Sequence, residues 1–413
     1  MKNLPTTFKR ELVSSLSFSL FFAVLRFVSF VVTAKFLSVA AFGVYAFFAF
    51  IYMLQIFTYE LAVFQYITKK QFSQTNRDVH IDDLRRSHTI NLFSGIALVF
   101  GVTIGLDLLT VGALMICIFT LNITNYYYYA FVSRLRFHQR QSVEIQFDFY
   151  SFGATLLFIT APLVILNGSD IDLVIVLTCS NLLRTIFMAV SMNSRSGPVA
   201  VTLSGLGSFF AGYRYEAIRM FTNKLYLQAP AAAIGFSSGI QLLGQFNRSS
   251  YVVDQFVNLL SRAFRFLLLR QVVLDDAATG YSKQVCRLTL AALVASPFFY
   301  LFGILLAPLF IALLGEQYGV LEHVLPIFLM AAPFKLANMW AVQIIKGLSD
   351  RIGLTLLNTA SILMYCVSIS QTESMVTIGI ILLLEAGFRQ CALISMAARL
   401  EARQRKVDHQ PSP

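Results

Sequence analysis

Long apolar runs, separated by short polar breaks, make up most of the chain. A helix needs roughly 20 apolar residues to cross a hydrocarbon core about 30 Å thick, and most of these runs are that long. Charged residues and Gly or Asn clusters mark the breaks. The pattern predicts an all-α integral membrane protein of about 12 transmembrane helices, at 13–35, 41–67, 88–109, 111–133, 143–166, 171–193, 217–241, 244–270, 287–313, 323–345, 352–370 and 375–398.

Charges in the breaks alternate along the chain. The N-terminus, the even-numbered connections and the C-terminal tail carry the loop lysines and arginines, whereas the odd-numbered connections carry only Lys35. The odd-numbered connections hold acidic residues instead, among them Asp107, Asp170 and Glu316. Positively charged loops stay in the cytoplasm. The alternation therefore predicts a multi-pass protein of the bacterial inner membrane with both termini in the cytoplasm.

The longest polar break, at 194–216, divides the predicted helices into two sets of six. The halves also share a weak sequence similarity, since Gly43 and Gly244 each precede an aromatic residue by two positions at the start of a helix. Parallel six-helix repeats are a recurrent plan among transporters. We expect an N-terminal six-helix lobe, a cytoplasmic linker, a C-terminal six-helix lobe and a cytoplasmic tail at 1–195, 196–216, 217–400 and 401–413.

Composition supports lipid as the solvent of most of this surface. Hydrophobic residues make up 57% of the chain and charged residues 13%, and the mean hydropathy is +0.70. A soluble fold needs more charge than this to cover its surface. The net charge of +11 follows from the basic cytoplasmic loops and their contact with anionic membrane lipids, so we expect no nucleic acid partner.

Motifs for catalysis or metal binding are missing from the sequence. The five cysteines and five histidines form no metal-ligand pattern, and the chain has neither a Walker A sequence nor a nucleophile elbow. The acidic pairs Asp82–Asp83 and Asp275–Asp276 are expected to be solvated charges in cytoplasmic loops. We predict a protein that is not an enzyme and that uses no metal and no cofactor.

Polar side chains fall on single faces of several predicted helices. Arg26 shares a face of the first helix with serines, and Tyr45, Tyr52 and Tyr59 recur every seven residues along the second. Similar stripes run along the first two helices of the second half. Matching stripes in both halves favour one aqueous cavity, although such stripes also serve as hydrogen-bonding contacts between helices. The tyrosines suit sugar stacking and helix packing equally well.

Ionisable residues inside membrane helices are costly and usually functional. Glu385 and Arg389, four residues apart, are expected to neutralise each other. Apart from this pair, cations outnumber acids, and a cationic cavity attracts a phosphate or an acidic sugar and repels organic cations. Asp254 and Glu60 are the candidates for ion coupling. The expected substrate-binding residues are Arg26, Tyr45, Tyr52, Tyr59, Arg184, Asn223, Tyr226, Arg248, Asn258 and Lys335.

Four short stretches carry a resemblance to a known family. They are FLSVAAFGVYAFFAF at 36–50, LGQFN at 243–247, GEQY at 315–318 and KGLSDR at 346–351. In order and spacing they resemble the polysaccharide transporter branch of the multidrug/oligosaccharidyl-lipid/polysaccharide (MOP) exporter superfamily, and in particular Wzx-type O-antigen flippases. Many relatives carry an acid early in the seventh helix, where this chain has Asn223–Lys224, so Asp254 becomes the better candidate for ion coupling.

The resemblance implies a MATE-like arrangement of two six-helix lobes around a central cavity. It also implies a flippase that moves an undecaprenyl-pyrophosphate-linked oligosaccharide to the periplasmic leaflet by ion-coupled alternating access. The product would serve O-antigen, other lipopolysaccharide, capsule or exopolysaccharide synthesis. A polysaccharide polymerase and a chain-length regulator are the protein partners that this role implies.

Two other functions fit parts of the pattern. A multidrug exporter of the same fold would favour acidic and aromatic residues over this cationic set. A membrane polysaccharide polymerase or glycosyltransferase usually carries a large outer loop with catalytic residues, and the outer loops here are too short for such a domain.

Overall fold

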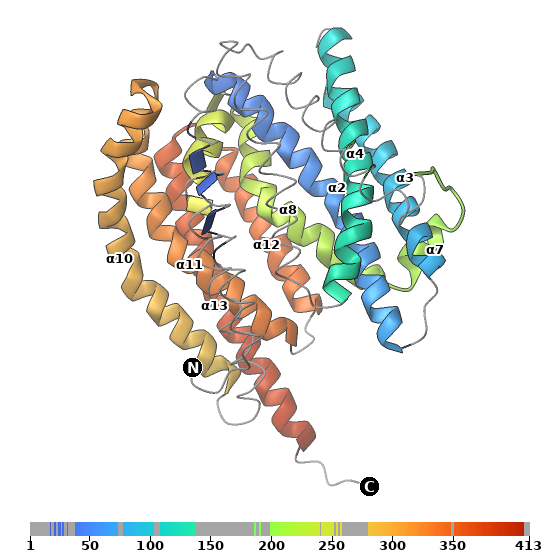
Figure 1. The fold of residues 1–413 in the computed structure, drawn as a ribbon. Coiled ribbons are helices and arrows are strands. Elements are labelled where there is room, and N and C mark those ends of the chain that lie inside the picture. The colour runs from blue at the N-terminus through green and yellow to red at the C-terminus, as the bar shows by residue number, and fades with distance from the viewer. Residues whose placement is uncertain are drawn as a thin grey trace. The chain divides into compact units, whose positions relative to one another are not determined.

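A computed structural model describes most of the second half of the chain and about half of the first. Its residues form two compact units, Met1–Gln228 and Ala229–Pro413 (Figure 1). Three predicted helices, at 13–35, 143–166 and 171–193, lie largely outside the described residues. The described residues are 38–72, 77–102, 108–137, 199–239, 241–251, 280–347 and 351–408, with single positions at 17, 20, 21, 24, 25, 27, 28, 31, 186, 190, 253, 254 and 257.

In the first unit, three long helices pack against one another. They are α2 (Val39–Phe72), α3 (Arg77–Val102) and α4 (Leu108–Phe137). A short helix, α7 (Leu206–Ala211), packs on α3, and α8 (Arg214–Ser237) follows it. Tyr59, Tyr126 and Phe209 are almost fully buried in the core that α2, α3, α4 and α7 share. Aromatic side chains therefore supply much of the buried area of this unit.

Helix α3 begins well before the apolar run that predicted it. The run starts at 88, whereas the helix starts at Arg77 and includes Asp82 and Asp83. The prediction that this acidic pair lies in a solvated loop is therefore wrong, and Asp83 is buried. Hydropathy misses the start of the helix because it is rich in charged residues, of which Asp83 is paired with Arg86 instead of exposed to water.

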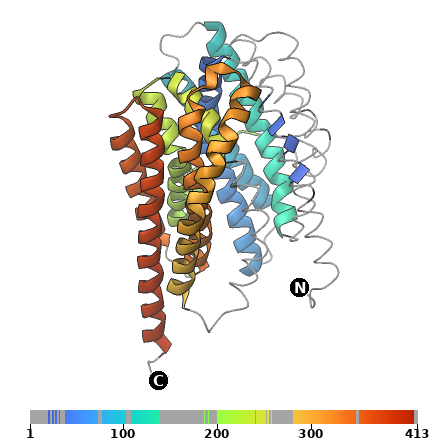
Figure 2. The same cartoon turned by 90° about the vertical axis from the view of Figure 1, so that its left-hand side faces the viewer.

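The second unit is built around α11 (Leu321–Gly347), which packs against α10 (Tyr281–Leu314) and α13 (Met375–Asp408). A short 3-10 helix, η1 (Glu316–Tyr318), joins α10 to α11. Helix α12 (Arg351–Ile369) packs on α13. Figure 2 shows α13 as one continuous helix that runs on toward the C-terminus. These helices lie close to the apolar runs that predicted them.

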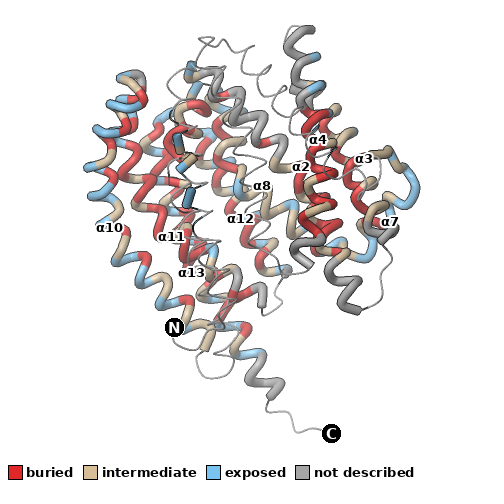
Figure 3. The backbone as a smooth tube through the Cα atoms, viewed as in Figure 1, coloured by how far each residue is buried: buried red, intermediate tan, exposed pale blue. Residues whose placement is uncertain are grey.

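Four helices of this unit, α10 to α13, are long and apolar enough to cross a membrane. The four helices differ in burial: 72% of the most apolar stretch of α11 is buried, but only 22% of that of α10. The outer face of α10 exposes Leu293, Phe298 and Leu305 (Figure 3). Meanwhile Glu385 and Arg389 of α13 are buried. Apolar side chains outside and polar ones inside are the arrangement that lipid favours.

A glycine brings α10 and α11 into close contact. A Cβ atom at Gly303 of α10 would lie 2.5 Å from the Cα atom of Pro326 in α11. Backbone atoms cannot move away as the end of a flexible side chain can. Gly303 therefore allows the two backbones to approach, which is how small residues promote packing of membrane helices.

Candidate functional site

The middle of the first unit contains a buried layer of polar side chains from three helices. Gln55 of α2 donates a hydrogen bond to the backbone carbonyl of Asn91 in α3, with 3.0 Å between the atoms. Thr58, one turn further along α2, donates to the side-chain oxygen of Asn91 at 2.9 Å. All three residues are buried. Amide and hydroxyl groups thus join α2 and α3 where water is excluded.

Tyr59 lies in the same layer and is fully buried. Its hydroxyl donates to the carbonyl of Asn122 at 3.0 Å and lies 3.3 Å from Nδ1 of His88. Its ring stacks on Tyr129 with 5.3 Å between the centroids. Of the two interpretations of the tyrosine stripe, helix packing therefore has direct support at Tyr59, while its contact with a sugar stays a prediction.

On the side of α2 that meets α8, the first unit holds an ion pair between distant parts of the chain. Lys224 Nζ lies 2.8 Å from Glu60 Oε1. The side chain of Lys224 is 15% exposed and that of Glu60 is 30% exposed. Glu60, a predicted coupling acid, thus forms an ion pair with Lys224 of α8.

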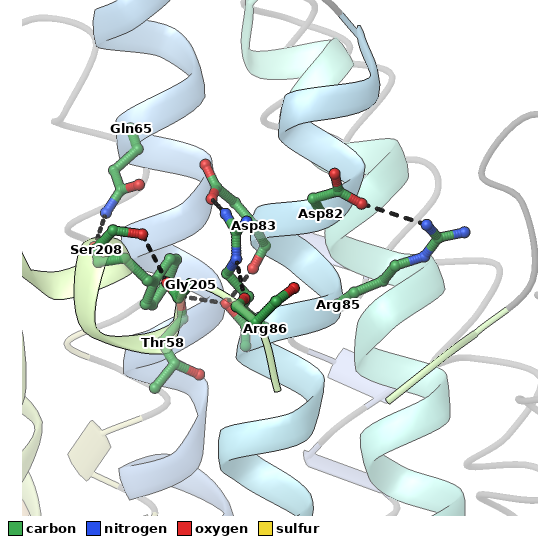
Figure 4. A network of polar contacts seen from close by, with 11 residues as sticks. Thr58, Gln65, Asp82, Asp83, Arg85, Arg86, Gly205 and Ser208 are labelled. Carbon is green, nitrogen blue, oxygen red and sulfur yellow. Dashed lines mark hydrogen bonds and ion pairs between the residues drawn. The ribbon is translucent and has the colours of Figure 1, made fainter. Parts of the chain in front are cut away.

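A second polar cluster holds the segment before α8 onto α3 (Figure 4). Asp83 and Arg86, one turn apart on α3, form an ion pair of 2.7 Å. Arg86 also donates to the carbonyl of Ser204 at 3.1 Å. Gly205 comes next, with φ at +72°, and a Cβ atom there would lie 3.0 Å from the Arg86 guanidinium. A glycine at this position therefore satisfies both the backbone turn and the close approach.

Two further hydrogen bonds attach the same segment. Gln65 of α2 donates to the carbonyl of Phe209 at 2.8 Å. The backbone N–H of Thr202 donates to the hydroxyl of Thr89 at 2.9 Å. The second half of the predicted linker thus contains helix α7 and is bonded to both α2 and α3. The partners in these two contacts are more than 100 residues apart in sequence, so no local pattern predicts them.

In the second unit, two predicted site residues meet. Lys335 Nζ of α11 lies 3.0 Å from Asp254 Oδ1, and the two side chains are 33% and 50% exposed. Lys335, which was predicted to attract an anion, thus pairs with Asp254, which was predicted to couple an ion. Among the described residues, a lysine–carboxylate pair thus joins separate helical segments in each unit.

Residues in and directly after LGQFN contact η1 and α11 in this unit. Arg248, directly after LGQFN, is almost fully buried, and its guanidinium lies 4.4 Å from the ring centroid of Tyr318 in GEQY. Phe246 packs edge-on against Phe328 of α11 at 5.8 Å. A guanidinium over an aromatic face is a favourable cation–π contact. The segment around LGQFN is therefore packed against η1 and α11.

A buried polar layer joins the last helices of the chain. Tyr365 of α12 donates to Glu385 of α13 at 2.6 Å. Arg389, one turn along α13, donates to the side-chain oxygen of Asn358 at 2.7 Å. Gln390 accepts a hydrogen bond from Thr289 of α10 at 2.9 Å. Glu385 and Arg389 thus each have a partner on α12, which sequence analysis missed although Asn358 and Tyr365 are spaced for one helical face.

The remaining predicted site residues are less fully described. Asn223 and Tyr226 lie on α8 and are half-buried. Tyr45 and Tyr52 belong to α2, and their side chains are outside the described set. Arg26, Arg184 and Asn258 also lie outside it. Within the residues that the structure describes, no group of three or more His, Cys, Asp or Glu side chains is placed to hold a metal ion.

Comparison of the chain with known proteins identifies its fold. No family model and no curated protein matches the sequence. Among solved structures, an outward-facing multidrug resistance MATE family transporter of the MOP superfamily matches with a TM-score of 0.60 at 12% identity, over 96% of this chain and 97% of the other. An inward-facing conformation of such a transporter matches with a TM-score of 0.55 at 11% identity, over 95% and 99%.

A MATE mutant gives a similar result, with a TM-score of 0.54 at 13% identity over 95% of this chain and 97% of the other. The chain therefore has the all-α integral membrane fold of MATE transporters in the MOP superfamily. This confirms the predicted fold class and a multi-pass membrane protein.

Proposed function

We propose that this protein is a flippase that moves undecaprenyl-pyrophosphate-linked oligosaccharides across the bacterial inner membrane for surface polysaccharide synthesis. A MATE-type fold is built for membrane transport. The stretches that resemble Wzx-type flippases select a lipid-linked glycan among the substrates of that superfamily. Within this proposal both termini are cytoplasmic, and a polysaccharide polymerase and a chain-length regulator act on the product.

The lysine–carboxylate pairs are the observation that most favours an anionic substrate. A carrier of organic cations needs carboxylates that can face the substrate. Glu60 and Asp254 instead lie 2.8 Å and 3.0 Å from Lys224 and Lys335. Each lysine offers a positive charge to a diphosphate or an acidic sugar once its carboxylate is neutralised. The predicted cations Arg26 and Arg184 would add to this attraction.

Energy for transport would come from an ion gradient, because the sequence has no nucleotide-binding motif. Glu60 and Asp254 are the acids that would exchange a cation, and the half-buried Asn223 and Tyr226 of α8 would contact sugars. Similarity to both outward-facing and inward-facing conformations of a MATE transporter supports an alternating-access cycle for this chain.

Deletion of the gene in the parent bacterium tests this function. Loss of surface polysaccharide, with lipid-linked oligosaccharide accumulating on the cytoplasmic side, is the expected result. Wild-type protein should restore the polysaccharide, and so should the control variant Lys283→Gln, since Lys283 is an exposed residue of α10. Unchanged surface polysaccharide in the deletion strain would contradict the proposal.

The main alternative is a multidrug exporter, since the solved structures with this fold include multidrug resistance transporters. Susceptibility of the same deletion strain to cationic dyes and drugs separates the two. An exporter predicts raised susceptibility with normal polysaccharide, and a flippase predicts lost polysaccharide even without drugs.

A further inference from the structure

The pair formed by Lys224 and Glu60 is placed for more than stability. It joins α8 to α2 across 164 positions of sequence, with 2.8 Å between the charged atoms. Both side chains keep some exposure, 15% for Lys224 and 30% for Glu60. Desolvation offsets most of the attraction between paired charges inside a protein, so such a pair adds little to stability. A functional role therefore explains the presence of this pair better than a contribution to stability does.

The pair lies on a different side of α2 from the buried polar layer around Tyr59. Tyr59, adjacent to Glu60, points toward α3 and α4, where its hydroxyl meets Asn122 and His88. Successive residues of a helix point about 100° apart. Glu60 therefore faces away from His88, on the side of α2 where Phe57 packs on Phe221 of α8 at 5.3 Å.

Other charges near this contact have partners of their own. On α8, Arg219 is paired with Glu216. On α3 and α4, the described titratable groups in contact with Tyr59 are His88, 3.3 Å from its hydroxyl, and Tyr129, whose ring stacks on it. Lys224 is thus the charged group that the described structure places directly against the Glu60 carboxylate.

We infer that Lys224 is a diphosphate-binding residue whose access is controlled by protonation of Glu60. In the resting pair, the Glu60 carboxylate binds the Lys224 ammonium and keeps other anions from it. When a diphosphate oxygen takes the carboxylate's place on Lys224, Glu60 is left without a counter-charge and takes up one proton. The ammonium stays charged throughout, one negative charge replaces another on it, and the carboxyl group becomes neutral.

This exchange links anion binding to proton binding at a single site. An incoming negative charge is accompanied by a proton, so the local net charge changes little, and release of the anion returns the proton. A lysine ammonium suits this task because it is a compact charge with three donors that can change partners. The inference rests on the proposed function for its choice of a diphosphate, although the site can be tested without any transport.

Binding of farnesyl diphosphate to the purified full-length protein in nanodiscs tests the site, with farnesol as the uncharged control. Calorimetry in two buffers of different ionisation heat gives both the affinity and the number of protons taken up. Wild-type protein should take up about one proton more than Glu60→Gln per bound diphosphate. Using this difference removes the ligand's own titration, since its last phosphate pKa is about 6.

The variants have opposite expected effects. Glu60→Gln should bind the diphosphate about tenfold more tightly at pH near 8, because nothing competes for Lys224. Lys224→Gln should bind at least about tenfold more weakly. The double variant with Gln at both positions leaves no lone charge, so it should fold and still bind weakly. Asp82→Asn is the control, because Asp82 pairs with Arg85 on α3.

Equal proton uptake by wild type and Glu60→Gln would overturn the inference, as would wild-type affinity in Lys224→Gln or in the double variant. Its failure is distinct from that of the proposed function. If the binding results hold while gene deletion leaves surface polysaccharide intact, the anion site stands and the flippase does not. If deletion abolishes polysaccharide while the variants bind like wild type, the flippase stands and the anion site does not.

Discussion

Lys335 of α11 lies 3.0 Å from the carboxylate of Asp254, and both side chains are partly exposed. Asp254 belongs to a predicted helix that precedes α11 by two spans, so the pair joins segments 81 positions apart in sequence. A pair with this much exposure is screened and adds little to folding. Its neutralisation therefore affects function more than stability.

Asp254→Asn is expected to leave the free energy of unfolding within about 1 kcal/mol of wild type, because exposed pairs contribute no more than this. It should, however, remove the dependence of transport on an ion gradient. Flipping of a fluorescent lipid-linked oligosaccharide in proteoliposomes, with and without an imposed proton or sodium gradient, measures this. Glu316→Gln, at an exposed acid of η1, is the control. A gradient response that survives in Asp254→Asn would remove Asp254 from ion coupling.

Hydropathy was enough to predict the helices of the second unit, because α10 to α13 coincide with apolar runs. It was not enough for α3, whose first turns carry Asp83 and Arg86. Those charges are satisfied by each other and by a carbonyl more than 100 residues away. No local pattern contains such a partner, so sequence alone placed Asp83 in a loop.

The partners of the candidate site residues could not be predicted from local sequence either. Helical phase groups polar residues on faces, but it cannot say which face meets which helix. The pairing of Lys224 with Glu60, and of Glu385 with Tyr365, depends on how each helix is rotated about its axis. That rotation is set by the packing of whole helices, which leaves only a weak trace in any single segment.

Gly303→Ala should destabilise the second unit by about 1–3 kcal/mol, the usual cost of adding atoms to a packed interior. The new methyl group would lie 2.5 Å from the Pro326 backbone, so α10 and α11 must separate. Gly387→Ala on α13 is the matched control, because among the described residues no atom beyond the neighbouring backbone of its own helix lies within 4 Å of the added Cβ. Thermal unfolding of the purified variants in detergent compares them. Equal melting temperatures would mean that α10 and α11 are not held this closely.

Tyr318→Leu should weaken the contact with Arg248 by about 0.5–2 kcal/mol, the range for a cation over an aromatic face. Tyr318→Phe keeps the ring and should retain most of that stabilisation. The difference between the two variants in thermal unfolding isolates the ring from the hydroxyl. If Tyr318→Leu is no less stable than Tyr318→Phe, the ring does not hold the buried guanidinium.

Tyr365→Phe should cost about 1.5–3 kcal/mol, since it removes a hydrogen bond to the buried Glu385 carboxylate. Thr359→Ala, at an exposed position of α12, should be close to wild type. Urea or thermal unfolding in mild detergent measures both. If Tyr365→Phe is as stable as wild type, the Glu385 carboxylate has a different main partner in the membrane.

Arg86→Gln and Arg85→Gln each remove one arginine–aspartate pair from α3, and the two pairs differ in how deeply the aspartate is buried. Each arginine pairs with an aspartate three positions earlier, but the side chain of Asp83 is 5% exposed and that of Asp82 is 47% exposed. Arg86→Gln leaves a buried carboxylate without its cation, which costs about 3–5 kcal/mol. Arg85→Gln removes a pair in which both side chains are partly exposed, and the loss of that pair should cost less than about 1 kcal/mol.

Arg86→Gln should also free the segment that Arg86 bonds through the Ser204 carbonyl. Limited proteolysis is therefore expected to cut this variant within 199–211 faster than wild type or Arg85→Gln. The double variant Asp83→Asn with Arg86→Gln has no lone charge, so it should recover stability while the segment stays more accessible. If cleavage rates are equal in all variants, the hydrogen bond donated by Gln65 and the one accepted by Thr89 suffice to hold the segment on α2 and α3.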